Sequence, residues 1–254
     1  MVLTNKFAMW CFSMIALAAA PVLAQEAKLP QGKEVLTRYF QVLGGEAKLA
    51  QVKSSEFLGK VTFRGAGIQG NMKVAIAEGG KFRQVMELEG VGTESSGSDG
   101  TTVWATSAVT GARLVEGIEA EQAKLANGHP VPQIGYGKYF ESIECTGVEK
   151  FDGVDCYVVK YVKADRKPMI DYFEKSTGLL RGTRQTMVTN QGNVEVQMTM
   201  SNYRDVEGIK YPFTSVMSLG PGLVMEVQLT SFSANAKLEP NQFELPADVA
   251  ALKE

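Results

Sequence analysis

The chain has 254 residues, of which 44% are hydrophobic and 21% are charged, and its formal net charge is −2 with a pI near 5.7. This composition excludes a disordered chain and provides enough apolar residues for one sizeable core. Lysines and arginines are scattered along the chain and form no basic stripe. The release of counterions that drives nucleic-acid binding requires such a stripe, so we expect no nucleic-acid partner.

The first residues have the features of an export signal. Lys6 precedes the apolar stretch FAMWCFSMIALAAAPVLA, and the small residues VLA before Gln25 form a cleavage site. The alternative is an uncleaved anchor, but Pro21 interrupts a stretch that is short for a span of about 20 residues. We therefore expect residues 1–24 to be removed and residues 25–254 to form a single exported domain. No cysteine lies directly after the cleavage site, which argues against a lipid anchor.

Two helices are predicted at the start of the mature chain. Apolar residues at helical spacing indicate a helix over residues 33–43, which a glycine pair ends, and a second short helix, EAKLAQV, leads into the first strand. From Phe57 onward the apolar period changes to two, which is typical of strands. One helical pattern interrupts this period at residues 118–127 and is followed by the loop GHPVPQIGYG.

The alternating segments predict about eleven antiparallel strands, joined by glycine-bearing turns such as AEGGKF and KSTG. At about 4.8 Å per strand, such a sheet is roughly 50 Å wide, whereas a covering helix is only about 10–12 Å wide. A wide sheet with one apolar face must curl on itself. We therefore expect a mainly β (α+β) fold, a half-barrel with a small helical lid.

Methionines are frequent on the apolar faces of these strands. In VEVQMTM, residues 194–200, valine and methionine alternate with polar residues, and flexible thioether side chains suit irregular apolar surfaces. Periodicity does not separate a filled core from a pocket, so both interpretations stay open. The residues that we expect to line a cavity are Phe63, Met72, Val74, Met86, Val196, Met198, Met200, Met217 and Met225.

Two cysteines of the mature chain, Cys145 and Cys156, flank a turn at Asp152-Gly153. With a two-residue hairpin turn there, Cys156 lies opposite Glu149, about 13 Å along the ladder from Cys145. That separation exceeds disulfide reach unless the strand bulges. In a compartment where disulfides persist, a disulfide and two free thiols both remain open.

Catalytic and metal-binding patterns are missing from the sequence. His129 is the one histidine and lies in a proline-flanked loop, no G-x-S-x-G motif occurs, and ligand clusters for a metal are lacking. GAGIQG, residues 65–70, matches a dinucleotide-binding fingerprint, but strand alternation follows it where a helix is required, so we interpret it as a turn. We expect no enzyme, no cofactor and no metal.

Three sets of segments, in order along the chain, resemble periplasmic outer-membrane lipoprotein-sorting and carrier proteins. They are YFQVLGGEAKLAQVKSSEFLGKV, the pair DCYVVKYV and DYFEKSTGLLRGTRQ, and YRDVEGIKYPF with the ending AKLEPNQFELP. The resemblance implies a half-barrel whose lid encloses an apolar cavity for acyl chains. It also implies a lid contact from an arginine of an early strand, for which Arg64 is the candidate, while the alternative is that Arg64 is a plain solvent-facing residue. Similar domains also occur beside peptidases, so the fold does not fix the cargo.

These observations predict a periplasmic carrier that holds lipid or lipoprotein acyl chains. An acyl chain is a sufficient ligand, because ten buried methylenes contribute roughly 8 kcal/mol before the ordering costs of binding. We expect the helix over residues 33–43 and the segment 118–134 to be movable covers. The alternative is an envelope module of the same fold that binds proteins, has a filled core and transports no lipid.

Overall fold

The computed structural model describes residues 28–189, 192–220, 222–239 and 241–253. The expected signal, residues 1–24, lies outside them. None of the helices in the described part of the chain is long and apolar enough to cross a membrane.

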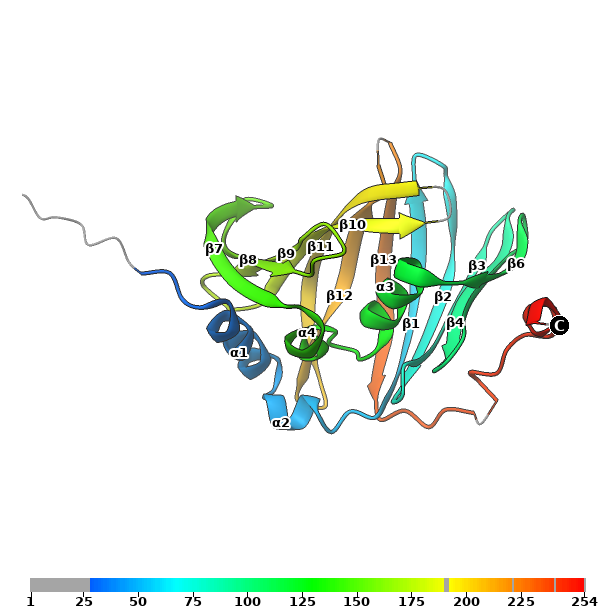
Figure 1. The fold of residues 1–254 in the computed structure, drawn as a ribbon, viewed down its shortest axis with the longest axis horizontal. Coiled ribbons are helices and arrows are strands. Elements are labelled where there is room, and N and C mark those ends of the chain that lie inside the picture. Colours follow the sequence, from blue (N-terminus) through cyan, green and yellow to red (C-terminus); the bar gives the residue numbers. More distant parts are fainter. Residues whose placement is uncertain (1–27, 190–191, 221, 240, 254) are drawn as a thin grey trace, which may run out of the picture.

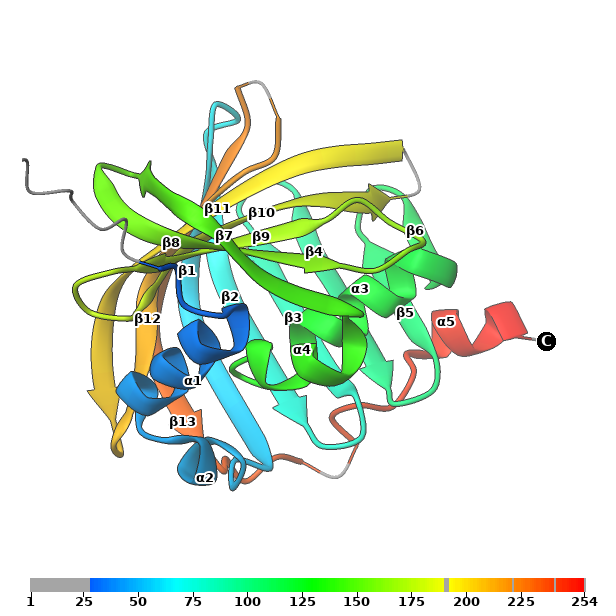
Figure 2. The same ribbon diagram turned by 60° about the vertical axis from the view of Figure 1, so that its left-hand side comes forward.

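The described strands form one antiparallel sheet (Figures 1 and 2). They are β1 (Ser54–Arg64), β2 (Ile68–Ala77), β3 (Lys81–Leu88), β4 (Gly92–Asp99), β5 (Val103–Ser107), β6 (Gly111–Val115), β7 (Ser142–Phe151), β8 (Val154–Val162), β9 (Met169–Glu174), β10 (Leu180–Thr189), β11 (Gly192–Val206), β12 (Ile209–Ser218) and β13 (Val224–Ala234). Their order in the sheet is β6-β5-β4-β3-β2-β1-β13-β12-β11-β10-β9-β8-β7. The first and last strands of the chain therefore pair at the centre of the sheet.

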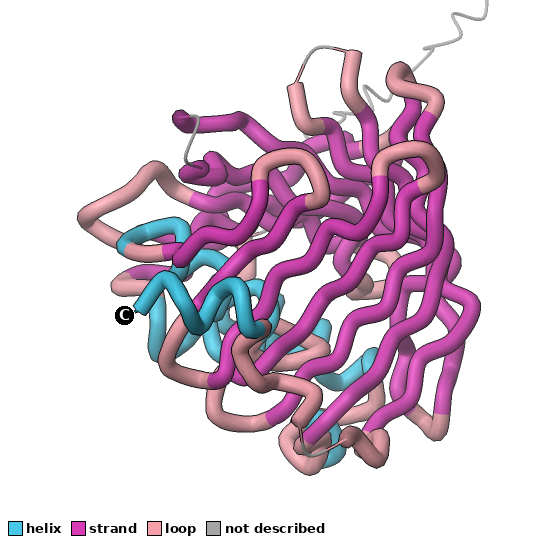
Figure 3. Tube along the Cα trace, turned by 90° about the vertical axis from the view of Figure 1, so that its right-hand side faces the viewer, coloured by secondary structure: helices cyan, strands magenta, loops and turns pink. Residues whose placement is uncertain are grey.

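The sheet curls but stays open, because β6 and β7 form its two edges and do not pair with each other. Figure 3 shows the strongly bent strands with the helices gathered to one side. The predicted antiparallel half-barrel is confirmed, with thirteen strands among the described residues where about eleven were expected.

The turns between strands follow the sequence signals. Asp152 and Gly153 form the two-residue turn between β7 and β8, with positive φ angles of 49° and 78°. GAGIQG begins in the turn between β1 and β2 and continues into β2, so its interpretation as a turn rather than a nucleotide-binding loop is confirmed.

Helix α1 (Gly32–Leu43) is packed firmly on the sheet, and α2 (Glu46–Leu49) follows it. The N–H of Gln31 donates to the Glu34 carboxylate at the start of α1, and Gly44, with a φ of 133°, ends the helix. Its apolar side chains Val35, Leu36, Tyr39, Phe40 and Leu43 are all buried. Moving α1 would expose five such side chains at about 1.5–3 kcal/mol each. The expectation that α1 is a movable cover is therefore wrong, and α1 is a fixed wall.

Helices α3 (Gly117–Asn127) and α4 (Gln133–Tyr139) lie over the concave side of the sheet. The helix α4 replaces part of the predicted loop. Its glycines and flanking prolines disfavour a helix locally, but Tyr136 packs edge-on against Phe140 and Tyr161, with ring centroids 5.2 and 5.0 Å away. Tertiary aromatic packing thus outweighs local propensity here.

A short helix, α5 (Ala247–Ala250), follows a strand-free segment that runs from β13 back to β6. Its buried residue is Val249. Helix α5 therefore packs beside the edge strand β6 and does not cover the concave side of the sheet.

Gly182 of β10 lies where a side chain has no room. A Cβ atom there would be 2.3 Å from the backbone oxygen of Met198 and 2.4 Å from the ring of Phe151. That ring stacks on Tyr172 with centroids 4.2 Å apart in a small cluster of buried residues separate from the main core.

We predict that Gly182→Ala lowers the free energy of unfolding by about 1–3 kcal/mol, because the backbone and ring must move to admit a methyl group. Gly147→Ala is the control, since a Cβ at Gly147 meets no atom within 4 Å. Urea unfolding followed by circular dichroism measures both. Equal stability of the two variants would contradict the packing described for this cluster.

Candidate functional site

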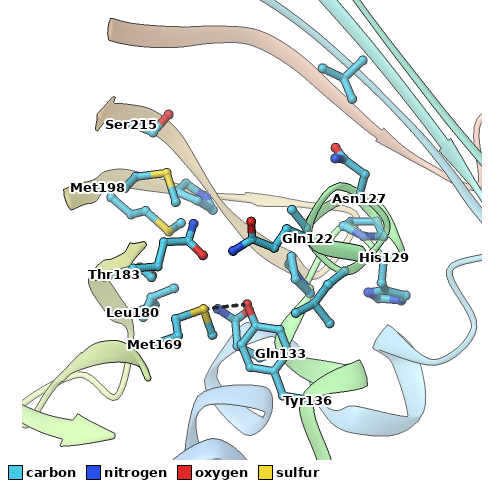
Figure 4. Close-up of a pocket in the computed structure, with 18 of the residues that line it drawn as sticks. Gln122, Asn127, His129, Gln133, Tyr136, Met169, Leu180, Thr183, Met198 and Ser215 are labelled. Atoms are coloured by element: carbon cyan, nitrogen blue, oxygen red, sulfur yellow. Dashed lines mark hydrogen bonds between the residues drawn. The ribbon is translucent and has the colours of Figure 1, made fainter. Parts of the chain in front are cut away.

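A cavity of about 310 Å³ lies between the concave face of the sheet and the segment from α3 to α4. Figure 4 shows Ser215, Met198 and Thr183 on the strand side of this space, with Gln122 and Asn127 on the helix side. The hollow arises because the two helices span the mouth of the curled sheet without filling the space beneath them.

Five of the nine residues expected in the cavity line it: Met72, Val74, Met198, Met200 and Met225. The other four, Phe63, Met86, Val196 and Met217, lie outside the lining.

The sheet register places Phe63 and Met217 in one row with two lining residues. Met198 pairs with Met217, Met217 with Met225, and Met225 with Phe63, so these four side chains share one face of the sheet. Only Met198 and Met225 of this row line the cavity, although Met217 lies between them. Alternation predicts the face of a side chain, but it does not predict which side chains on that face line the cavity.

Met86 and Val196 also share the concave face without lining the cavity. Met86 pairs with the lining residue Met72 but has Glu94 as its other neighbour, towards the sheet edge. Val196 is buried opposite Gln185. Val196 therefore lies behind the cavity lining rather than in it.

The sequence analysis missed the polar part of the lining. Gln84, Gln185 and Thr183 point into the cavity from strands, and Gln122 and Gln133 reach it from α3 and α4. The signal was present in the alternation, since Gln84 falls between Phe82 and Met86 on the apolar face of its strand. Polar residues at apolar-face positions therefore mark the cavity wall.

Helix α3 is attached to the sheet by polar contacts and by the half-buried apolar side chains of Ala120, Ala123 and Leu125, which pack against the main core. None of its residues is buried. The Gln122 side chain donates to the Thr186 carbonyl at 2.8 Å and accepts from the Val188 N–H at 2.9 Å, and Glu119 pairs with Arg113 of β6. Helix α3 is therefore held less firmly than α1, because its apolar side chains are only half-buried.

A buried carboxylate lies behind the cavity wall. Asp171 of β9 is fully buried and accepts hydrogen bonds from the Thr183 hydroxyl at 2.7 Å, the Tyr161 hydroxyl at 3.0 Å and the Gln133 amide at 3.3 Å. Burial raises the pKa of Asp171 to about 6, against the lowering effect of these three hydrogen bonds. Asp171 therefore links the cavity residue of α4 to the sheet through a polar contact.

His129 has a structural role in the loop between α3 and α4. Its Nε2 lies 3.0 Å from the Leu49 carbonyl, and its Nδ1 accepts from the Val131 N–H at 3.0 Å. Burial lowers the pKa of His129, which keeps the ring neutral and able to make both bonds. No group of three or more potential metal ligands occurs in the part of the chain that the structure describes.

Arg64 is exposed, which agrees with the solvent-facing alternative rather than with the lid contact. It pairs with Glu226 of the neighbouring strand β13. Arg64 follows Phe63, whose side chain shares the concave face, so strand alternation places the arginine on the outer face. The ion pair therefore joins two central strands away from the cavity.

Cys145 and Cys156 are free thiols, so the disulfide alternative is wrong. Cys145 pairs with Val159 and Cys156 with Glu149, which leaves the two sulfurs on separate rungs of the ladder. The register shift beside Cys145 does not bring them together. Burial raises the pKa of both thiols, that of Cys156 to about 11, so both are protonated at neutral pH.

The fold has clear counterparts among solved structures. No protein-family model matches the sequence, and a comparison with curated proteins gives no match. A DUF1329 family protein from Desulfovibrio piger superposes with a TM-score of 0.57 at 13% identity, covering 84% of this chain and 95% of that one. A LolA superfamily protein from Nitrosomonas europaea gives 0.55 at 12% identity, with coverages of 85% and 99%.

A third counterpart is a putative outer membrane lipoprotein-sorting protein domain from Vibrio parahaemolyticus, with a TM-score of 0.53 at 12% identity and coverages of 84% and 97%. The chain has the LolA-like fold. The resemblance seen in the sequence is confirmed at the level of architecture, and identities this low carry no information on cargo. The cavity, the helices that cover it and the buried carboxylate are the features of this chain that bear on its function.

We predict that Asp171→Asn flattens the dependence of stability on pH. The folded-state pKa of about 6 lies above the ordinary value of 3.8, so the native state binds more protons than the unfolded state between these values. Asp171 therefore makes stability fall as pH rises through that window, by up to about 3 kcal/mol at about 1.4 kcal/mol per pKa unit.

Urea unfolding between pH 4 and pH 8 measures this effect, and the variant should gain stability relative to the native protein as pH rises. Asp155→Asn is the control, because Asp155 is an exposed carboxylate whose pKa lies below its ordinary value beside Lys150. Parallel pH profiles for the native protein and Asp171→Asn would show that Asp171 ionises as it does in water.

Proposed function

We propose that the protein is a periplasmic carrier that holds lipid or lipoprotein acyl chains in the cavity beneath α3. The observation that carries this proposal is a hollow of about 310 Å³, lined in part by five apolar residues that alternate along the strands, under a helix with no buried residue. The LolA-like fold and the signal-like residues 1–24 support the same role. The role is one of binding, with no chemical step.

The size of the cavity suits a hydrocarbon chain. A volume of about 310 Å³ holds roughly ten groups the size of a water molecule, whose share of liquid volume is about 30 Å³. Ten methylenes of comparable size would contribute about 8 kcal/mol on burial. The methionines Met72, Met198, Met200 and Met225 can change rotamer to follow the shape of a chain.

The alternative role, a protein-binding envelope module without lipid, requires a filled concave side. The hollow beneath α3 is the observation that disfavours it. Extraction of the purified mature protein with organic solvent, followed by mass spectrometry, separates the two roles. We expect stoichiometric lipid in the extract, whereas an extract free of lipid together with no uptake of added lipid would leave only the protein-binding module.

We predict that Met198→Arg weakens binding of the neutral probe N-phenyl-1-naphthylamine by about tenfold or more, because the variant places an unpaired charge in the cavity. Asn193→Arg is the matched control, since Asn193 is exposed on the same strand and the substitution adds the same charge. Fluorescence titration measures both affinities. Unchanged affinity in a folded Met198→Arg variant would place the probe elsewhere.

We also predict that Gln122→Ala weakens the attachment of α3 to β10. The variant loses the two hydrogen bonds to β10, worth about 0.5–1.5 kcal/mol each, so amides of residues 117–132 should exchange about tenfold faster with deuterated solvent. Gln41→Ala on the exposed side of α1 is the control. Hydrogen exchange measured by mass spectrometry reports both variants, and unchanged exchange across 117–132 would mean that α3 is held by other contacts.

A further inference from the structure

The cavity contains hydrogen-bonding side chains that have no partner. Gln84 of β3, Gln185 of β10 and Ser215 of β12 line it. Within the described part of the chain these three side chains make no hydrogen bond, in contrast to Gln122, whose amide is fully engaged with β10. Unpaired amide and hydroxyl groups facing a hydrocarbon would lose their solvation without compensation. A purely apolar ligand would therefore leave these three side chains without hydrogen-bond partners.

The curl of the sheet is what brings these groups to one cavity. Five strands separate β3 from β10 in the sheet order, so in a flat sheet Gln84 and Gln185 would be about 29 Å apart at about 4.8 Å per strand. Ser215 approaches from a strand between them. A ligand beneath α3 consequently meets polar groups from both arms of the sheet as well as the methionines of its centre.

Charges around the cavity disfavour an anionic ligand. The nearest buried charge is the carboxylate of Asp171, which bonds directly to the lining residues Thr183 and Gln133. The two cationic residues of the lining, Arg166 and Lys167, are already paired with carboxylates. Those ion pairs are Arg166 with Asp165 and Glu121, and Lys167 with Glu195. A ligand carboxylate in the cavity would therefore lie near the Asp171 carboxylate, which repels it, and near no cationic lining residue that is free of an ion pair.

We propose that the ligand of this cavity is a lipid whose hydrocarbon part carries an uncharged hydrogen-bonding group, a hydroxyl or an amide, that is bound by Gln84, Gln185 and Ser215. This inference rests on the proposed carrier function and makes it more specific. Glutamine amides and a serine hydroxyl both donate and accept, so they match hydroxyl and amide groups in either direction. Free fatty acids are poor ligands because their carboxylate meets no cation inside.

The experiment compares four probes with the same chain length at pH 8: dodecanamide, dodecanol, dodecanoate and dodecane, each displacing N-phenyl-1-naphthylamine from the mature protein. Dodecanamide and dodecanol should bind about tenfold or more tightly than dodecanoate. Equal affinity for dodecanoate and dodecanamide overturns the inference while the carrier function stands. Failure of all four probes to displace the dye overturns the carrier function itself.

The double variant Gln84→Leu with Gln185→Leu assigns the selectivity to these residues. It should lower the affinity for dodecanamide about tenfold and leave the affinity for dodecane unchanged or higher. Gln228→Leu, on the outer face of β13, is the control and should change neither. Circular dichroism confirms folding, and if the double variant does not fold, Gln185→Met alone provides the same comparison. Equal losses for dodecanamide and dodecane would show a packing defect and overturn the assignment.

Discussion

The structure depends on a mismatch between the width of the sheet and the amount of helix available to cover it. Thirteen strands joined edge to edge carry one largely apolar face, and a face of that width is hidden from water only when the sheet curls. Curling removes most of the exposure but creates a hollow. Helix α1 fills one end of the hollow with its buried side chains, while α3 and α4 span the rest and leave about 310 Å³ beneath them.

Helices α1 and α3, which cover the hollow, are held by different kinds of interaction. Helix α1 is fixed by the hydrophobic effect, with Tyr39 tilted against Phe173 at 5.1 Å between ring centroids. Helix α3 is held by the two hydrogen bonds of Gln122, by the ion pair of Glu119 and by half-buried apolar side chains. The proposed entry of a ligand beneath α3 would leave in place the wall that α1 forms.

The fold was accessible from the sequence because alternation, turn residues and the scarcity of helix all indicate one curled antiparallel sheet. The site was only partly accessible. Alternation placed Met198 and Met217 on the same face, but no local pattern encodes which of the two lines the cavity, and only Met198 does so. Helix α4 escaped prediction because the packing of Tyr136 on Tyr161 overrides its glycines. The solvent-facing alternative for Arg64 was open from the sequence, but its partner Glu226 is visible only in the structure.

The most direct measurement is a crystal structure of the protein grown with 12-bromododecanol, using the anomalous signal of bromine to locate the chain. The account requires a bromine peak and continuous density in the space between the methionines of β11 and β13 and helix α3. Side chains meeting across that space, with bromine found only on the outer surface of the protein, would contradict the central claim that the curled sheet encloses room for a hydrocarbon.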